Sequence, residues 1–470
     1  MIVNSKDQKN FTPLKAIDIK DVKNPENQEL FKTYKDGDTQ YMVLSDRISK
    51  GDKDVQTGDF VNALQKVLKD AKTPYSIDFE SFNKFGVPAK DLVGMMVNAI
   101  YYGENIPLTY KTEHPVKTVE HNLQIDEKVH QDDIEKAKVI ADTSVFVRKL
   151  QDTPTCYMRP QNFADEMKKL FAPLIKAKKV KFIIHDEKWL KDKGFNLLLG
   201  VNAGSADPCC LIEVQYMAGA KDEGTTALVG KGVCFDTGGY NLKWTPHIRW
   251  MKYDMSGAAT VMGTIYALAT NNVKTNVVAL GAMVANEIGP KAQHPDDVWK
   301  SYNGKYVEIE NTDAEGRLIM ADTIAYAVKD LKKSLNVNRL IDISTLTMAM
   351  IIALGDTYTG VWTSKDATWK KYQEAATKSG ELVWRMPFHK DYRDMLKSDI
   401  ADIMNAVRSP LGGSSRAAEF LRSFTDGIDY VHLDVCGTSF KDNKGQASML
   451  RTMYNFVSPQ EANKIVKDMK

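Results

Sequence analysis

Residues 227–243 read ALVGKGVCFDTGGYNLK, an apolar run that ends in an aspartate and a glycine pair. The apolar run 227–235 predicts a buried strand, and Gly238 and Gly239 permit a tight turn after it. The strand would deliver Lys231 and Asp236 near its carboxyl end, so a lysine and an aspartate are expected to share one edge of the sheet.

Short apolar runs alternate with helical patterns on both sides of this stretch. Strand–helix alternation is typical of an α/β domain with a largely parallel or mixed sheet. We therefore expect two domains, a smaller N-terminal α/β domain and a larger C-terminal α/β domain whose mixed central sheet is flanked by helices. The expected strands are 180–184, 211–216, 277–284 and 340–343, and the expected helices include 257–269 and 318–331.

Changes in hydrophobic pattern suggest where the domains meet. Residues 1–131 are rich in lysine and aspartate, with short periodic segments at 60–68 and 92–102, and we assign them to the N-terminal domain. Apolar positions at helical intervals over 132–152, stopped by Pro154, predict a linker helix. Residues 153–470 form the C-terminal domain, in which the Gly/Ser segment 411–415 is expected to be a mobile loop.

Composition and charge argue against several functional classes. The chain has 63 Lys+Arg and 61 Asp+Glu, a formal net charge of +2, so no overall field attracts nucleic acid or an anionic membrane. The longest apolar run, 348–355, is about half of the ~18 residues of a membrane span and is expected to be a buried strand or helix. The polar N-terminus lacks the apolar core of a secretory signal. We expect a cytoplasmic protein without a membrane segment.

Cysteine and histidine form no recognisable metal-binding pattern. The five cysteines are odd in number and include no C-x-x-C pair, so they are expected to be reduced thiols. The eight histidines include no H-E-x-x-H. Any metal ion would therefore depend on oxygen ligands.

A first acidic candidate is Asp254, in the sequence RWMKYDMSGAA at 249–259. It lies just before the expected helix 257–269. The alternative to a metal ligand is a simple helix N-cap, a common role for aspartate.

Two further carboxylates, Asp313 and Glu315, lie in IENTDAEGRLIMAD at 309–322. If the backbone is extended there, residues two apart point to the same side. Neighbouring carboxylates repel one another unless a cation lies between them, so the pair favours a metal site. The alternative is an acidic turn in which Arg317 is a local ion-pair partner.

Four carboxylates and one amine together suffice to hold two divalent ions. Bridging carboxylates can place such ions ~3.5–4 Å apart, the geometry of two-metal hydrolysis. Lys231 must be neutral to bind a metal, which neighbouring dications permit by lowering its pKa. Lys243 and Arg317 would stay cationic and stabilise negative charge on a carbonyl oxygen. This arrangement fits acyl hydrolysis, whereas a two-metal phosphoesterase would leave the two spaced lysines unexplained.

The motif NTDAEGRL at 311–318 resembles the signature of the leucine aminopeptidases, the M17 metallopeptidase or cytosol aminopeptidase family. Residues 229–259 are similar to the other metal-binding stretch of that family, with its internal spacing intact. The first ~130 residues match no motif and correspond to a variable domain of the family. Similarity from about residue 150 onward includes STLT at 344–347, SDIADIMN at 398–405 and HLDVCGT at 432–438.

The resemblance implies a dinuclear metal-dependent aminopeptidase that removes N-terminal amino acids from short peptides, with a leucine-type preference. The C-terminal domain would be catalytic. The metals would be Mn or Zn, with Co and Mg as alternatives. The tighter ion would be bound by Lys231, Asp236, Asp254 and Glu315. The more exchangeable ion would be bound by Asp236, Glu315 and both the carboxylate and the backbone carbonyl of Asp313.

The same resemblance implies the catalytic roles. A metal-bridging water or hydroxide would attack the first peptide carbonyl, which Lys243 would polarise. A bicarbonate ion held by Arg317 would act as general base. One metal would take the free α-amine of the substrate, which makes the activity an exopeptidase.

The residues implied to contact the substrate are Met251, Asn311, Thr345 and Leu346, although Met251 and Leu346 also suit an apolar core. Met348 stands where the family commonly has glycine, so a thioether would narrow or reshape the side-chain pocket. Four bulky residues also replace smaller ones, and they would line the entrance or pack between subunits. These residues are Trp244, His247, Arg249 and Trp250.

The resemblance also implies a homohexamer with inward-facing catalytic domains, whose lumen admits short peptides with a free N-terminus. Some bacterial relatives contact DNA, so the alternative is a DNA-binding or regulatory role of the hexamer beside or instead of peptidase activity. The balanced charge and the lack of a basic stripe argue against nucleic acid as a partner.

Overall fold

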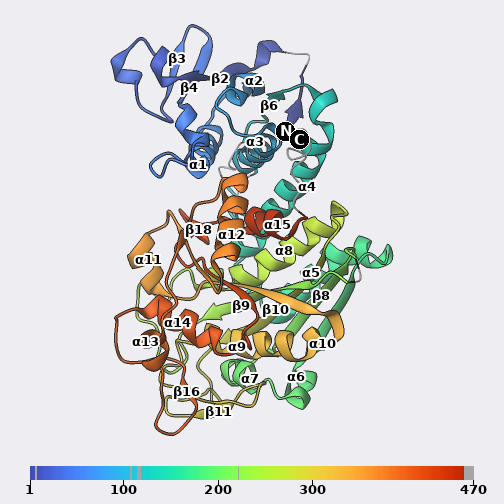
Figure 1. Cartoon of the computed structure of the whole chain (residues 1–470), viewed down its shortest axis with the longest axis vertical. Helices are drawn as coiled ribbons and strands as arrows, with labels where there is room; N and C mark the ends of the chain where they lie inside the picture. The colour runs from blue at the N-terminus through green and yellow to red at the C-terminus, as the bar shows by residue number, and fades with distance from the viewer. Residues whose placement is uncertain (6–7, 106–107, 114–117, 221, 460–470) are drawn as a thin grey trace, which may run out of the picture.

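The computed structural model describes residues 1–5, 8–105, 108–113, 118–220 and 222–459. Figure 1 shows an upper lobe formed by the N-terminal residues and a larger lower lobe with a central sheet. Helix α4 (Glu127–Asp152) packs against α3 (Ala89–Glu104) in the upper lobe and α8 (Ser256–Thr270) in the lower lobe. It contains the predicted helical segment 132–152 and begins five residues earlier, where the Asp126 side chain accepts a hydrogen bond from the amide of Lys128. The α/β fold class is confirmed.

The upper lobe contains a six-stranded sheet in the order β1-β6-β5-β2-β4-β3. Only β3 and β4 pair antiparallel. The predicted helical segment 60–68 lies in α1 (Thr57–Lys69), and 92–102 lies in α3. The other elements of the upper lobe are β1 (Ile2–Val3), β2 (Thr12–Asp18), β3 (Thr33–Asp36), β4 (Thr39–Leu44), β5 (Tyr75–Asp78), α2 (Phe79–Asn83) and β6 (Asn122–Gln124).

The lower lobe contains an eight-stranded mixed sheet in the order β15-β14-β17-β13-β9-β10-β8-β7. The four central strands, β17, β13, β9 and β10, are parallel, so their carboxyl ends meet at one edge. All five strands predicted in this region are confirmed. The strands are β7 (Lys181–Asp186), β8 (Cys210–Met217), β9 (Thr225–Asp236), β10 (Asn276–Asn286), β13 (Val337–Ser344), β14 (Thr359–Thr363), β15 (Val383–Arg385) and β17 (Asp429–Asp434).

Helices cover both faces of this sheet, and each face has its own apolar core. In β9, Leu228 belongs to one core and its neighbour Val229 to the other. Burial on both faces explains why these strands read as continuous apolar runs. One face is covered by α4, α5 (Pro160–Lys176), α8, α12 (Asp366–Ser379) and α15 (Leu450–Val457), and the other by α6 (Glu187–Lys193), α7 (Asn196–Asn202), α9 (Gly316–Tyr326) and α14 (Gly413–Arg422).

Smaller elements complete the lower lobe. The predicted helix 318–331 is confirmed as α9 followed by a π-helical segment, Ala327–Leu331, and the short helix α10 (Lys332–Leu335). The others are β11 (Val298–Lys300), β12 (Tyr306–Glu308), α13 (Lys390–Asp394), β16 (Ile403–Met404), β18 (Phe440–Lys441) and β19 (Lys444–Gly445).

Two local predictions are wrong. The apolar run 348–355 forms a helix, α11 (Met348–Leu354), but it lies at the surface: only Met350 is buried, and Ile352 is 82% exposed. The Gly/Ser segment 411–415 is not wholly a loop, because α14 begins at Gly413. Gly412 has a φ of +61° and is the N-cap, and the apolar side chains that follow are packed in the core. Tertiary context thus outweighs local composition in both segments: the apolar run is left at the surface, and part of the Gly/Ser segment is packed as a helix.

Candidate metal centre

The turn predicted after β9 is confirmed, and it fixes the carboxylate of Asp236. Gly238 and Gly239 have φ values of +88° and +63°, and a Cβ on Gly238 would lie 2.5 Å from the carbonyl oxygen of Asn241. Oδ1 of Asp236 accepts hydrogen bonds from the Gly238 amide and the Asn286 side chain, both at 2.8 Å. Oδ2 is the oxygen that remains to pair with Lys243, whose Nζ lies 2.9 Å away.

Lys231 lies within β9 and is only 3% exposed. Its Nζ is 2.8 Å from Oδ1 of Asp254, 2.8 Å from Oε1 of Glu315, and donates a 2.8 Å hydrogen bond to the Thr345 carbonyl. A Cβ on residue 316 would lie 2.6 Å from Cε of this lysine, so the glycine at the start of α9 leaves room for the Lys231 side chain. The lysine nitrogen therefore lies among two carboxylates and one backbone carbonyl, which come from three separate segments.

The alternative that Asp254 serves only as a helix N-cap is wrong. It lies in the 3₁₀ helix Met251–Met255, and the N-cap of α8 is Met255. Oδ1 of Asp254 accepts a 2.6 Å hydrogen bond from Oγ1 of Thr345. Oδ2 is buried and has no hydrogen-bond partner among the described residues. A buried, unpaired carboxylate oxygen is costly, and a bound cation would satisfy it.

Asp313 and Glu315 are close together, but not for the predicted reason. Asp313 lies in a turn, and Glu315, with φ −77° and ψ −36°, is the N-cap of α9, so the segment is not extended. Three carboxylate oxygens, one each from Asp236, Asp313 and Glu315, all lie within 4.8 Å of one another. Lys243 Nζ is 2.5 Å from Oδ1 of Asp313. Together, the donor set of carboxylates and an amine fits divalent cations.

The pKa values show how strongly these charges interact. Burial and the charge of Asp236 raise the pKa of Glu315 to about 8 and that of Asp313 to about 6. Burial lowers the pKa of Lys231, but the attraction of Asp254 and the other carboxylates outweighs it, so the pKa is raised overall. Lys231 is therefore an ammonium in the metal-free protein, and it must lose a proton to bind a metal.

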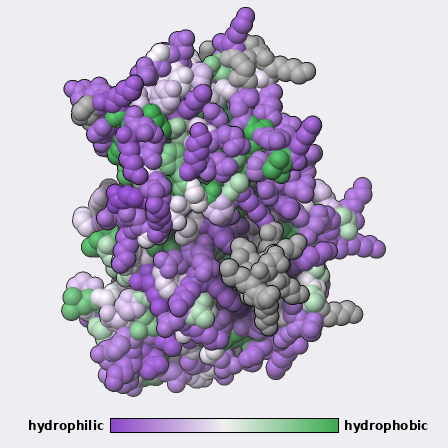
Figure 2. Space-filling model, turned by 45° about the horizontal axis from the view of Figure 1, so that its top comes forward, coloured by the Kyte–Doolittle hydropathy of each residue, from purple (hydrophilic) through white to green (hydrophobic). Residues whose placement is uncertain are grey.

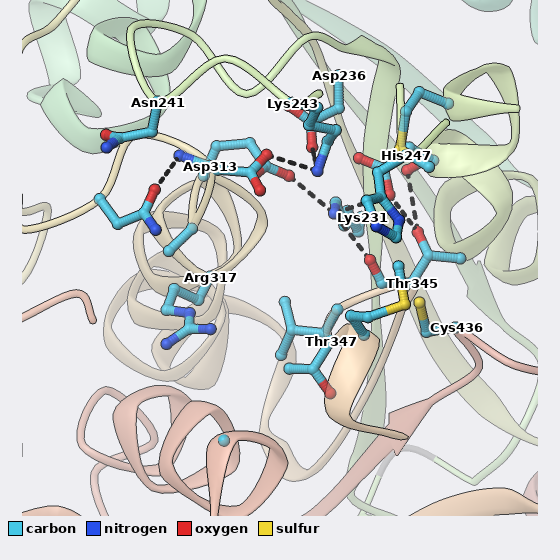
Figure 3. Close-up of a pocket in the computed structure, with 18 of the residues that line it drawn as sticks. Lys231, Asp236, Asn241, Lys243, His247, Asp313, Arg317, Thr345, Thr347 and Cys436 are labelled. Atoms are coloured by element: carbon cyan, nitrogen blue, oxygen red, sulfur yellow. Dashed lines mark hydrogen bonds and ion pairs between the residues drawn. The ribbon is translucent and has the colours of Figure 1, made fainter. Parts of the chain in front are cut away.

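Arg317 lies apart from this network (Figure 3). Its Nη1 donates a 2.7 Å hydrogen bond to the carbonyl of Asn405, and its buried Nε has no hydrogen-bond partner within the described parts of the chain. Burial lowers its pKa to about 10. The alternative of a local ion pair is wrong, because no described carboxylate lies within 4.0 Å of its guanidinium nitrogens.

A single pocket of about 520 Å³ contains every residue that the sequence nominated for metal binding, catalysis or substrate contact. Trp244, His247, Trp250 and Met348 also line it, whereas Arg249 does not. Sequence reasoning missed Arg416, Cys436 and Phe440; Cys436 lay within the quoted motif HLDVCGT, which was a usable signal. The nominated residues in the pocket are Lys231, Asp236, Lys243, Met251, Asp254, Asn311, Asp313, Glu315, Arg317, Thr345 and Leu346.

Comparison with known proteins finds a family match over the part of the chain that contains this pocket. The model of the cytosol aminopeptidase family, catalytic domain, matches residues 145–456. The chain belongs to the cytosol aminopeptidase family. It is 41% identical over 405 residues to the probable cytosol aminopeptidase of Mycoplasma pneumoniae, covering 85% of this chain and 89% of the relative. Identity to the probable cytosol aminopeptidase of Mycoplasma genitalium is 39% over 412 residues, covering 86% and 90%. The cytosol aminopeptidase of Rickettsia prowazekii is 40% identical over 311 residues, covering 66% and 61%.

Membership in the cytosol aminopeptidase family makes this protein a peptidase hydrolase of the leucyl aminopeptidase type, and the family is in general metal-dependent. On the face shown in Figure 2, hydrophilic residues predominate and hydrophobic residues form small patches. Within the described ranges, no helix combines the length and apolarity needed to cross a bilayer.

Proposed function

We propose that this protein is a dinuclear metalloaminopeptidase that removes the N-terminal residue, with a leucine-type preference, from short peptides. The observation that carries the proposal is the convergence of Asp236, Asp313 and Glu315 within 4.8 Å, beside Lys231 and the unpaired oxygen of Asp254. Two divalent cations bound there would supply Lewis acidity and an ionised water as nucleophile.

Asp236 and Glu315 would be ligands of both ions. Lys231 and Asp254 would complete the tighter site, and the carboxylate and carbonyl of Asp313 would complete the more exchangeable one. Carboxylate oxygens suit Mn or Mg, and the amine suits Zn or Co. The hydrogen bonds to Oδ1 of Asp236 fix its orientation before any ion binds.

Lys243 and Arg317 would act on the substrate instead of the metals. Lys243 pairs with Asp236 and Asp313 in the metal-free protein. With those carboxylates occupied by metal ions, the Lys243 ammonium would be free to donate a hydrogen bond to the carbonyl oxygen of the scissile bond and would stabilise the negative charge that develops there. The unpartnered Nε of Arg317 is available to hold bicarbonate as the general base.

The rest of the pocket would hold the peptide. A metal ion bound in the acidic cluster would take the free α-amine, which would set cleavage at the first residue. Met251, Asn311, Thr345 and Leu346 line the same pocket and would contact the substrate. Met348, 46% exposed at the start of α11, would narrow the space for the first side chain.

The assembly and the domain boundaries complete the proposal. We propose a homohexamer, a cytoplasmic location and the division into residues 1–131, 132–152 and 153–470. Light scattering of the active protein is expected to give a mass near six chains, and a monomer mass at full activity would contradict the hexamer.

The peptidase proposal is tested by hydrolysis of leucinamide in the presence of Mn²⁺, Co²⁺ or Zn²⁺. Glu315→Gln should abolish turnover. The matched control is Glu310→Gln, because Glu310 lies five residues away, outside the pocket, and pairs with the exposed Arg408. Equal turnover by wild type and Glu315→Gln would contradict the proposal. Hydrolysis of a phosphate ester in preference to the amide would favour a phosphoesterase, and a salt-sensitive gel shift would favour the DNA-binding alternative.

A further inference from the structure

Arg416 is a buried cation in the pocket to which the proposed function gives no role. It lies in the first turns of α14, lines the pocket beside Gly413 and is only 6% exposed. Its Nη2 donates to the carbonyl oxygen of Ser409. Its Nη1 is buried and has no hydrogen-bond partner among the residues that the structure describes.

The charge of Arg416 has no counter-charge in the described parts of the chain. No carboxylate there lies within ion-pair distance of it, and burial lowers the pKa of the guanidinium. Its position also opposes the helix dipole, because the N-terminal end of a helix favours anions over cations. Gly412, the N-cap, contributes no side-chain acceptor. A buried cation in such a place is costly unless an anion joins it.

Arg416 lies at the same end of the pocket as Arg317. One short loop connects them, since Arg317 donates to the carbonyl of Asn405 and Arg416 donates to that of Ser409. The positive charge of Arg416 contributes to lowering the pKa of Arg317. The carboxylates of the acidic cluster, in contrast, pair with Lys231 and Lys243. The pocket is therefore anionic at one end and cationic at the other.

We propose that Arg416 binds a carboxylate carried by the peptide substrate. A peptide whose α-amine lies at the acidic cluster would present negative charge towards the arginines either from the C-terminal carboxylate of a dipeptide or from an acidic side chain in the second residue. The free Nη1 and the α14 N-terminus both favour such a group. This inference rests on the proposed function and adds a substrate class to it.

The test compares three substrates: Leu-Gly, its C-terminal amide Leu-Gly-NH₂, and Leu-Asp-NH₂. The enzymes are wild type, Arg416→Gln, which keeps a donor for the Ser409 carbonyl but no charge, and Arg416→Lys, which keeps the charge. Arg422→Gln is the matched control, because Arg422 lies on the same helix, outside the pocket, and pairs with Glu419.

Wild type is expected to favour at least one carboxylate-bearing substrate over Leu-Gly-NH₂ by about 10- to 100-fold in kcat/KM, mainly through KM. Arg416→Gln should remove that preference, Arg416→Lys should restore part of it, and Arg422→Gln should leave it intact. Loss confined to Leu-Gly identifies the C-terminal carboxylate, and loss confined to Leu-Asp-NH₂ identifies the side chain. The proposal is overturned if the wild type shows no such preference. It is also overturned if Arg416→Gln lowers kcat/KM equally for all three substrates, a result that indicates a structural role or a free inorganic anion.

A binding measurement separates this inference from the peptidase proposal. The probe is the Leu-Gly analogue with a reduced peptide bond, titrated as its carboxylate and as its amide into metal-loaded protein by calorimetry. Tighter binding of the carboxylate form by wild type, and not by Arg416→Gln, supports the inference even if no substrate is hydrolysed. Equal binding of both forms, together with an equal affinity for the reduced-bond analogue of Leu-Asp-NH₂, overturns it, whether or not leucinamide is cleaved.

Discussion

The two ends of the pocket handle buried charge in opposite ways. At the acidic end, four carboxylates surround Lys231 and Lys243, and the ion pairs are as short as 2.5 Å. At the arginine end, Arg317 and Arg416 donate only to backbone carbonyls, and each keeps a buried nitrogen without a partner within the described chain.

This difference shows which ligand each end requires. Lysines partly neutralise the acidic end, and one carboxylate oxygen of Asp254 is still unpaired, so cations would complete it. No carboxylate of the described residues forms an ion pair with Arg317 or Arg416, so an anion would complete the arginine end. Separate charge deficits imply that metal binding and anion recognition can be lost separately, and the following changes test that separation.

The largest effect is expected from Asp236→Asn at the acidic end. The variant keeps most of the shape but loses a charge that both proposed ions share, so activity should fall on the order of a thousandfold or more. Metal content, measured by elemental analysis after gel filtration, should fall with it. Asp356→Asn, at an exposed ion pair with Lys441, is the control and should change neither quantity. Full metal content together with undiminished activity would show that Asp236 is not a ligand of the metal centre.

Arg317→Gln changes the arginine end of the pocket and leaves the carboxylates of the acidic end in place. We expect activity to fall by about a hundredfold, the scale of a lost electrostatic stabiliser, while metal content stays at the wild-type value. Elemental analysis and leucinamide kinetics on the same sample measure both. Loss of metal from this variant would show that the two ends are not independent.

The pH dependence of metal affinity is expected to arise from the acidic end alone. Raised pKa values, about 6 for Asp313 and about 8 for Glu315, mean that Glu315 holds a proton at neutral pH and that Asp313 gains one below about pH 6; Lys231 is also protonated. Cation binding must release these protons. The affinity for Mn²⁺ should therefore rise with pH between about 6 and 8, by about tenfold per pH unit for each proton released, and it should decrease again when the pH is lowered. Calorimetry in buffers of different ionisation enthalpy would count the protons. Binding without proton release would contradict a lysine ligand.

The smallest effect is expected from Met348→Ala, which leaves both charged ends intact. Removing a half-exposed thioether should shift the ratio of kcat/KM for phenylalaninamide over leucinamide upward by about three- to tenfold. Ile352→Ala is the matched control on the same helix, because Ile352 is 82% exposed and does not line the pocket. An unchanged ratio in Met348→Ala would exclude this residue from the side-chain pocket.

The acidic end was more accessible to sequence reasoning than the arginine end. The apolar run before Asp236 and the two glycines after it encode a buried strand and a tight turn, and both are confirmed. The extended conformation considered for Asp313 and Glu315 is wrong, because the two converge through a turn that is hydrogen-bonded to the loop after β9 and through the start of α9. Arg416 was missed, because an arginine after a Gly/Ser segment reads as a solvent-exposed loop residue and only tertiary packing buries it.

The most direct test is anomalous scattering from crystals of the protein loaded with Mn²⁺. The account predicts two anomalous peaks per chain, both among Lys231, Asp236, Asp254, Asp313 and Glu315, with none at Arg317 or Arg416. A single peak, or peaks outside this cluster, would contradict a dinuclear centre at the acidic end.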